Sequence, residues 1–586
     1  MNTPQVIFDG NCGFCRIWAD YWKRLTGDQV EYTPFQEAAG QFPEIPIDRF
    51  ARSVHLALPD GEMLNGAHAV FRALSFGPGR PWLLEMYRHV PGFAVVSEWA
   101  YGLIAAHRPL FFRLTKLLFG PVIEPASYAR VQWLFWKMLG AIYGMAFLSL
   151  AVQVRGLIGA KGILPAGAYL GQIQRAIGPS RFWNFPTVFW LSGSSDLALM
   201  LACAAGVALA ALVVAGYLER IALIGCYVLY LSLITVGQDF LSFQWDILLL
   251  ETGFLAIFLG LSPLIVWLFR WLLFRLMLLS GAVKLLSGDA AWRSLVALKF
   301  HYYTQPLPTV VAWYMQQLPG WFQEVSLVVM FAIELGACFL IFGPRRVRFF
   351  GGFCIVFLQV MILLTGNYTY FNWLAIGLCI LLLDDAALGR LASGTNKLKH
   401  VPLIPLVTIL ILVISGGQLL GEFFGVMPAP IRLLQRAVGP FYLTNTYGLF
   451  AVMTTERHEI IVQGSNDGSQ WRDYEFKYKP GAVDRAPRWV APHQPRLDWQ
   501  MWFAALGSYR NNPWFVNFVF RLLQGSPRVL ALLGSNPFPE APPRYIRALV
   551  FDYTFTDFET RRATGAWWKR EPRGIYLPAI ALEDFR

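Results

Sequence analysis

Nine apolar runs between residues 131 and 420 constrain the fold of this chain more than any other feature of its sequence. A helix needs about 20 consecutive apolar residues to cross a bilayer, and it satisfies its own backbone polar groups there. We therefore expect a polytopic α-helical transmembrane bundle. Because only Ser262 and Pro263 separate the fourth run from the fifth, about eight or nine helices are expected. The runs lie near residues 133–154, 196–217, 221–237, 245–261, 263–286, 321–342, 347–365, 368–383 and 401–420.

The composition supports this class and argues against nucleic acid as a partner. Of the 586 residues, 56% are hydrophobic and 15% are charged, whereas about a quarter of a typical soluble protein is charged. The formal net charge is +12, but the basic residues of the hydrophobic middle lie mostly near helix ends, as positive-inside anchoring predicts. We expect membrane lipids, and no nucleic acid, as partners.

Basic residues between the runs predict the orientation of the bundle. Arg220, the segment 344–348 and the tail that holds Arg390, Lys397 and Lys399 are expected on the cytoplasmic side. Counting back places the residues before the first run in the cytoplasm, and the residues after the last run on the opposite face. The membrane is expected to be the cytoplasmic membrane in a bacterium and the endoplasmic reticulum membrane in a eukaryote. Four basic residues that fall on the far side count against this orientation: Arg155, Lys161, Arg175 and Arg181.

Soluble regions are expected on both sides of the bundle, which makes the chain a multi-domain protein. Residues 1–125 are expected to form an α/β domain, because short strands alternate with helices there. Residues 126–420 form the transmembrane domain, and residues 421–586 a β-rich domain. The first domain is predicted to have strands at 6–8, 30–32 and 54–58 and helices at 12–25 and 66–74. The last is predicted to have strands at 459–463, 474–478 and 546–555, a helix at 498–506 and helical sequence at 514–533, interrupted near 525–527.

The pair Cys12-Gly-Phe-Cys15 follows the first predicted strand and opens the first predicted helix. A helix amino terminus stabilises a thiolate, and a second sulfur one turn away can resolve a mixed disulfide. We therefore expect Cys12 to be the attacking thiol and Cys15 the resolving thiol. Zinc binding and an inert pair are the alternatives, although no second Cys-x-x-Cys exists to complete a zinc site. Neither a metal nor another cofactor is expected.

The segment Phe8-Asp9-Gly10-Asn11-Cys12-Gly13-Phe14-Cys15 resembles the start of the DCC family of thiol-disulfide oxidoreductases, and residues 60–70 resemble its later block. The resemblance covers roughly the first 110–120 residues. It implies a thioredoxin-like fold, a redox-active Cys12 and Cys15 supported by Asp9 and Gly10, and a thiol-redox partner protein. Ser53 departs from classical thioredoxins, because it occupies the place where a cis-proline would be expected.

A polar block at residues 287–308 interrupts the bundle, within an extramembrane loop at 287–320. It is too polar to face lipid, and long ordered loops tend to carry function. General acid–base chemistry is open to its Arg293, Lys299 and His301, but no hydrolase motif accompanies them. The three alternatives are a loop folded onto the bundle with its polar groups satisfied, a client-binding surface and an enzymatic centre.

The same block resembles the signature loop of the lipase maturation factor family, as do residues 445–454, 459–468 and 493–503 farther on. Together these blocks span about 130–586. The resemblance implies a membrane-bound folding factor for secreted lipases, with a client lipase as partner. The residues expected to bind the client are Asp289, Arg293, His301, Tyr302, Thr304, Gln305, Pro306, His493, Arg496 and Trp499.

Three basic residues lie in or beside a predicted span: Arg270, Arg275 and Lys284. Charge inside a membrane is costly and by default suggests a functional site. The alternative function is therefore a membrane-embedded enzyme or transporter that uses these charges, with the redox domain as regulator. The structural explanation of these charges is that their side chains extend from a helix end to the membrane surface. Asp239, Asp246 and Glu251 are candidate counter-charges, and the sequence does not show which pairs form.

Overall fold

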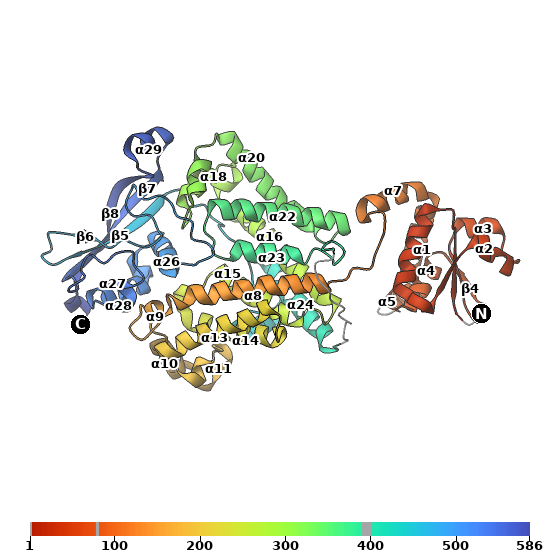
Figure 1. Cartoon of the computed structure of the whole chain (residues 1–586), viewed down its shortest axis with the longest axis horizontal. Coiled ribbons are helices and arrows are strands. Elements are labelled where there is room, and N and C mark those ends of the chain that lie inside the picture. Colours follow the sequence, from red (N-terminus) through yellow and green to blue (C-terminus); the bar gives the residue numbers. More distant parts are fainter. Residues whose placement is uncertain (1–2, 78–80, 390–400, 586) are drawn as a thin grey trace. The chain divides into compact units, whose positions relative to one another are not determined.

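The structure, a computed structural model, describes residues 3–77, 81–389 and 401–585 (Figure 1). Contacts divide the chain into two compact units, Met1–Ser127 with Phe342–Phe350, and Tyr128–Ile341 with Gly351–Arg586. Residues 126–420 and 421–586 both fall in the second unit, and the buried ion pair between Asp246 and Arg496 joins them; their division into two domains stays a prediction. The basic tail with Arg390, Lys397 and Lys399 lies outside the described residues.

The first unit is an α/β domain, as predicted. Its sheet has the order β2-β1-β3-β4, in which β1 and β2 are parallel and the other pairs are antiparallel. Val6 and Ile7 of β1 enter different buried clusters, one on each face of the sheet, because successive side chains of a strand alternate. The elements are β1 (Gln5–Phe8), α1 (Gly13–Thr26), β2 (Glu31–Pro34), α2 (Phe35–Ala38), α3 (Ile47–Arg52), β3 (His55–Ala57), β4 (Met63–Asn65), α4 (Gly66–Ser75), α5 (Pro81–His89), α6 (Phe93–Ala106) and α7 (Arg108–Phe119).

The second unit contains the bundle, and seven of its described helices are long and apolar enough to cross a membrane. The runs expected at 245–261 and 368–383 are helical but have only 15 and 10 residues. The expected count of about eight or nine helices is therefore not confirmed. The first of these two ends before Gly260, whose φ of +81° favours glycine. The helices are α8 (Ala129–Ala151), α13 (Asp196–Ala215), α14 (Glu219–Gly237), α15 (Gln244–Phe258), α16 (Pro263–Leu286), α20 (Gly320–Phe331) continuing through a π-helical turn (Ala332–Ala337) into α21 (Cys338–Leu340), α22 (Arg345–Thr365), α23 (Phe371–Ile380) and α24 (Leu403–Phe424).

Helix α8 runs from one end of the bundle to the other. At its start, the backbone N–H of Ala129 donates to the carboxylate of Asp385 at 2.8 Å. Near its end, the Oγ of Ser149 accepts from the N–H of Gln494 at 2.9 Å. The C-terminal region thus lies at the end of the bundle where α8 finishes, which we call the distal end. Loop 287–320 lies there too, since it hydrogen bonds to the C-terminal region. The assignment of the distal end to the non-cytoplasmic face stays a prediction.

The C-terminal region contains an antiparallel sheet of order β6-β5-β7-β8. The strand expected at 474–478 is mostly absent, because β6 ends at Asp473 and only Tyr474 continues its pairing, with Val462. Strand β8 was not expected. The helical sequence after 513 is interrupted at Gly525, as predicted. The elements are α25 (Ala429–Val438), β5 (Arg457–Ser465), β6 (Arg472–Asp473), α26 (Arg496–Ala505), α27 (Pro513–Leu523), α28 (Pro527–Leu530), β7 (Tyr545–Phe555), α29 (Phe558–Thr564) and β8 (Trp568–Ala581). Between α16 and α20, the loop forms α17 (Ala290–Arg293), α18 (Leu298–Thr304) and α19 (Val310–Gln316).

Candidate functional site

The first candidate site is the cysteine pair at the start of α1. Cys12 caps this helix, and its Sγ accepts a hydrogen bond from the N–H of Cys15 at 3.4 Å. The sulfur of Cys12 therefore lies at the positive end of the helix dipole, which favours a negative charge there. Both cysteines are free and partly exposed. This is the geometry that an attacking thiol requires.

The turn before Cys12 is fixed by Asp9 and Gly10. The Oδ1 of Asp9 accepts from the N–H of Asn11 and from the Nε2 of Gln36, both at 3.0 Å. A Cβ on Gly10 would lie 2.8 Å from the Cβ of Pro34, so only glycine fits between the turn and β2. Both residues therefore support the position of the thiols, although a role in the chemistry stays a prediction.

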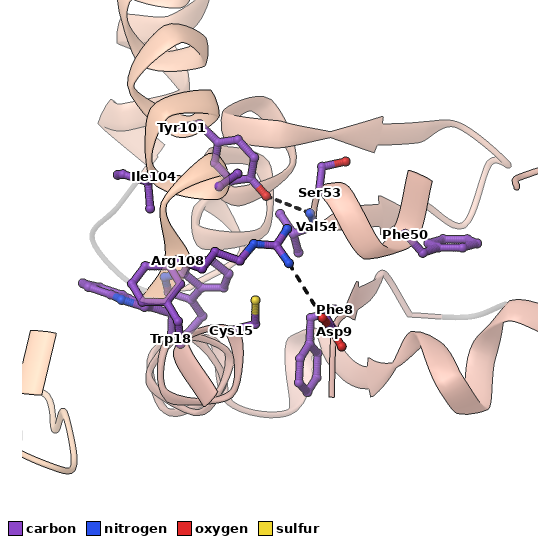
Figure 2. Close-up of a pocket in the computed structure, with 13 residues that line it drawn as sticks. Phe8, Asp9, Cys15, Trp18, Phe50, Ser53, Val54, Tyr101, Ile104 and Arg108 are labelled. Atoms are coloured by element: carbon purple, nitrogen blue, oxygen red, sulfur yellow. Dashed lines mark hydrogen bonds and ion pairs between the residues drawn. The ribbon is translucent and has the colours of Figure 1, made fainter. Parts of the chain in front are cut away.

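Cys15 faces a small apolar cavity of about 50 Å³ (Figure 2). Burial raises the pKa of the Cys15 thiol well above its usual range, and the hydrogen bond to Cys12 adds to this effect. A half-buried thiol with a raised pKa is a poor first nucleophile, which suits a resolving role. The cavity is lined by Phe8, Asp9, Phe14, Cys15, Trp18, Trp22, Phe50, Ser53, Val54, Tyr101, Ile104, Ala105 and Arg108.

Two residues of α6 and α7 complete this cavity, and the sequence analysis did not identify either. Arg108 approaches Asp9 at 3.7 Å, and its positive charge partly offsets the raised pKa of Cys15. The hydroxyl of Tyr101 accepts the N–H of Val54 at 2.8 Å (Figure 2). Val54 directly follows Ser53, so the backbone N–H next to Ser53 already has Tyr101 as its hydrogen-bond partner. The available signal was Arg108 at the start of a mostly apolar helical segment.

The second candidate site lies at the distal end, where the bundle meets the C-terminal region around Asp246. Arg496 of α26 donates to both carboxylate oxygens of Asp246, at 2.9 and 2.8 Å. The hydroxyls of Tyr230 and Tyr370 donate to the same carboxylate at 2.5 and 2.8 Å. Asp246 and Arg496 are at most 1% exposed. A pair buried this well holds its two elements together because separating the charges would leave each one uncompensated.

Glu251, on the same helix α15, binds the segment that follows α25. Arg275 of α16 forms an ion pair with one oxygen of Glu251 and donates to the carbonyl of Asn445 at 2.8 Å. The other oxygen accepts from the N–H of Asn445 at 2.9 Å and from the hydroxyl of Tyr447 at 2.7 Å. The predicted counter-charges Asp246 and Glu251 are thus both paired, but only Glu251 pairs with one of the three intramembrane basic residues.

Lys284 pairs with a carboxylate that was not a candidate. Its Nζ lies 2.9 Å from Glu334 in the π-helical turn and also donates to the carbonyl of Ser280. A Cβ on Gly281 would lie 2.9 Å from the Cβ of Glu334, so glycine allows α16 and this turn to approach. Arg270 donates to the hydroxyl of Tyr128 at 2.9 Å. Partners for all three basic residues favour a structural role over a transport pathway.

The loop 287–320 is tied to the C-terminal region by both side chains and backbone. The Oδ1 of Asp289 accepts from the N–H of Ala291 at 2.8 Å and caps α17, while its Oδ2 accepts from the N–H of Met453 at 3.1 Å. Arg457 of β5 donates to the carbonyls of Tyr303 and Pro306, each at 2.9 Å. Arg457 is itself paired with the buried Glu459. The polar groups of the loop are therefore largely satisfied within the chain.

Most residues expected to bind a client are buried in this arrangement. Gln305 bridges the carbonyls of Tyr302 and Thr365 and accepts from the hydroxyl of Tyr368. Trp499 packs edge-on against Trp245, with ring centroids 4.8 Å apart. Arg293 alone in the set is exposed, whereas three are half-buried (Asp289, His301 and His493) and six are buried (Tyr302, Thr304, Gln305, Pro306, Arg496 and Trp499).

The two histidines of the set are partly shielded from water. Burial lowers the pKa of His301 to about 4, and the nearby charge of Lys284 acts in the same direction. Burial likewise lowers the pKa of His493 to about 4, and the charge of Arg496 contributes. Both rings are therefore neutral at pH 7, and the Nδ1 of His493 hydrogen bonds to Ser149 at 2.9 Å. Within residues 3–77, 81–389 and 401–585, no cluster of three or more His, Cys, Asp or Glu side chains is arranged to hold a metal.

The fold and its two sites define a multi-pass membrane protein with an α/β domain that carries a Cys-x-x-Cys pair. Comparison with protein families matches residues 6–114 to the DCC1-like thiol-disulfide oxidoreductase model, residues 130–390 to the lipase maturation factor transmembrane domain, and residues 443–578 to the lipase maturation factor C-terminal domain. The chain belongs to the lipase maturation factor family.

Three curated relatives illustrate the extent of the similarity. Lipase maturation factor 1 of Bos taurus is 36% identical over 77% of this chain and 89% of its own length. Lipase maturation factor 2 of Gallus gallus is 35% identical over 78% of this chain and 82% of its own length. Lipase maturation factor 1 of Homo sapiens is 34% identical over 80% of this chain and 91% of its own length. No solved structure matches the chain.

Proposed function

We propose that this protein is a membrane-bound maturation factor that holds a client lipase at the distal end while the lipase folds. The observation that carries the proposal is that loop 287–320 and the segments at 445–454 and 493–503 meet there. Arg496, Asp289 and Asn445 each contribute to that junction. The names of the relatives, which are lipase maturation factors, support a lipase as the client.

The test of this proposal measures a secreted lipase in cells. Removing the gene should lower the yield of active lipase without lowering its synthesis, and restoring the gene should restore the yield. Unchanged activity of every secreted lipase would contradict the proposal.

Within the distal end, the buried residues are proposed to set the shape of the surface and the exposed residues to touch the client. Arg293 is the exposed member of the predicted set, and its guanidinium donates to the carbonyl of Leu285 at 3.1 Å. Arg293→Ala should lower the yield of active lipase with little loss of stability. Gln305→Ala should lower both, because it removes three buried hydrogen bonds. Equal loss of stability in both variants would contradict this division of roles.

The first unit is proposed to exchange disulfides through Cys12 and Cys15, on a thioredoxin-like fold that its βαβ unit and antiparallel hairpin support. In the direction that reduces a partner, the thiolate of Cys12 attacks the partner's disulfide, forms a mixed disulfide and expels one partner thiolate. The expelled partner thiolate takes the proton of Cys15, and the Sγ of Cys15 then attacks the Sγ of Cys12, forms the Cys12–Cys15 disulfide and releases the second partner thiolate. Cys12→Ser should abolish exchange and leave membrane insertion intact. A wild-type domain without exchange activity would contradict the assignment.

The proposed setting is the endoplasmic reticulum membrane, because the relatives described above are vertebrate proteins and offer no support for a bacterial membrane. The first unit is proposed to lie in the cytoplasm and the distal end on the opposite face. Direct transfer of a disulfide from Cys12 to a client at the distal end would then need a relay. Cysteine labelling from each side, at Cys12 and at a cysteine introduced for the exposed Lys299, tests this orientation. Labelling of both positions from one side would contradict it.

A further inference from the structure

Helices α6 and α7 present an apolar outer face that nothing within the described part of the first unit covers. The exposed fraction is 68% for Trp99 and 64% for Leu117. Such a run of large apolar side chains on consecutive helices marks an interaction surface rather than scattered exposure. Only His107 separates the two helices. We call this surface the α6–α7 face, made of Val95, Val96, Trp99, Leu103, Leu110, Leu114 and Leu117.

The α6–α7 face lies on the reverse of the helices that line the redox cavity. At about 100° per residue, Val95, Trp99 and Leu103 share one side of α6, and Tyr101 and Ile104 lie on the other side. The latter two line the cavity beside Cys15. On α7, Leu110, Leu114 and Leu117 share a stripe, whereas Arg108 and the buried Thr115 point the opposite way. Both helices thus turn one face to the same cavity and the other face outward.

The chain itself indicates what covers this face. Helix α7 ends at Phe119, and the first membrane-spanning helix begins at Ala129. The first unit also includes Phe342–Phe350, which contains the start of the spanning helix α22. Two chain segments of this unit therefore belong to, or lead directly into, helices that cross the membrane. The lipid bilayer is therefore the apolar environment nearest to this unit along the chain.

The composition of the face fits a lipid surface. Trp99 is a residue type that concentrates at the membrane interface, and Arg113 and Lys116 are exposed beside the Leu110 stripe. Apolar residues flanked by basic residues are typical of helices that lie in the headgroup region. Helix α6 has 14 residues, which is too short to cross the bilayer. A helix of this length and composition is suited to lie on the membrane.

We propose that the α6–α7 face rests on the lipid surface from which α8 and α22 enter the membrane, with Arg113 and Lys116 at the phosphate headgroups. The opposite faces of the same helices then turn the redox cavity toward the aqueous phase. The thiol partner of Cys12 is accordingly a soluble molecule rather than one dissolved in the bilayer. This inference goes beyond the proposed exchange activity, and only its last step rests on that activity.

The test uses the full chain in single-copy lipid nanodiscs, with an environment-sensitive fluorescent amino acid at Leu110. The matched control is the same label at Ile47 of α3, an apolar residue of the same unit that is 65% exposed and lies outside the α6–α7 face. Lipids that carry a nitroxide quencher should reduce emission at Leu110 by about two-fold or more relative to Ile47, because interfacial helices bury their apolar face ~5–10 Å into the headgroup–acyl boundary. Limited proteolysis checks that the labelled unit is folded.

Replacing phosphatidylcholine with phosphatidylglycerol should increase the quenching at Leu110, and the paired changes Arg113→Gln and Lys116→Gln should remove that increase. Equal quenching at both labelled positions would overturn the proposal. A blue-shifted emission at Leu110 without quenching by lipid would overturn it too, because protein would then cover the face. Neither readout depends on dithiol exchange. A Cys12 without exchange activity would therefore refute the proposed redox function and would not affect the proposed membrane contact.

Discussion

Arg496→Met should loosen the C-terminal region from the bundle. Arg496 is buried, and its guanidinium donates three hydrogen bonds of 2.6–2.9 Å, two to Asp246 and one to the carbonyl of Phe240. Removing one partner of a buried ion pair costs about 3–5 kcal/mol, because the remaining charge is left uncompensated. Asp246→Leu should cost a similar amount. These costs are a large fraction of the total stability of a typical protein.

The double variant, Arg496→Met with Asp246→Leu, separates the pair from its surroundings. If the two changes were independent, their costs would add to about 6–10 kcal/mol. Because both charges are absent, we instead expect about 1–3 kcal/mol. The hydroxyls of Tyr230 and Tyr370 also hydrogen bond to each other at 2.6 Å, so only one of them loses its acceptor when Asp246 is removed. The free energy of unfolding is measured by denaturant titration in mixed micelles, with tryptophan fluorescence as the signal.

The control is Arg293→Met, which removes an exposed arginine and should change the free energy of unfolding by no more than about 0.5 kcal/mol. A double variant as unstable as the sum of the single variants would refute the pairing argument. An Arg496→Met protein of full stability but low lipase yield would instead assign Arg496 to the client surface.

Three further outcomes are expected. Arg457→Ala should cost about 1–3 kcal/mol of unfolding free energy, because it removes hydrogen bonds to the loop carbonyls of Tyr303 and Pro306 while Lys479 still pairs with Glu459, and should make loop 287–308 sensitive to protease. Cys15→Ser should accumulate a mixed disulfide on Cys12 in non-reducing gels, whereas Cys12→Ser should accumulate none. Lowering the pH from about 6.5 to 4 should destabilise the fold by at most ~3 kcal/mol through His301, since its pKa of about 4 in the folded chain lies below the unfolded value and the unfolded state binds the proton first. His301→Gln should flatten this part of the stability profile; an unchanged slope would contradict the burial of this ring.

The sequence pattern predicted local structure well where hydrophobic periodicity is strong. The strands at 6–8 and 546–555 and the helices at 12–25 and 498–506 are present within a few residues. Strand β8 was missed because Pro572 and Pro578 interrupt it and most of its side chains are exposed, which removes the alternation that marks a strand. The shortness of α15 and α23 was missed as well. An apolar run shows that a segment avoids water, but not whether lipid or protein surrounds it.

The candidate sites show where such prediction stops. The Cys12–Cys15 pair was found because its residues are only three positions apart, and its chemistry depends on that short spacing in the sequence. The partners of Lys284 and Asp246 were not found, since Glu334 and Arg496 lie 50 and 250 residues away. Periodicity gives the face of a helix on which a charge lies, whereas the neighbour across that face depends on packing between helices. For the same reason, Arg108 of the redox cavity could not be assigned.

The position of Asp246 on α15 has a consequence for the time course of assembly. Tyr230 precedes it by only 16 residues, and Tyr370 follows it by 124, but its counter-charge Arg496 is made 250 residues later. At about 5–20 residues per second, the ribosome needs roughly 12–50 s to reach that arginine. Glu251 waits far less, because Arg275 follows it by 24 residues. The charge of Glu251 can therefore be paired early in synthesis, but Asp246 receives its cation only when translation of the chain is nearly complete.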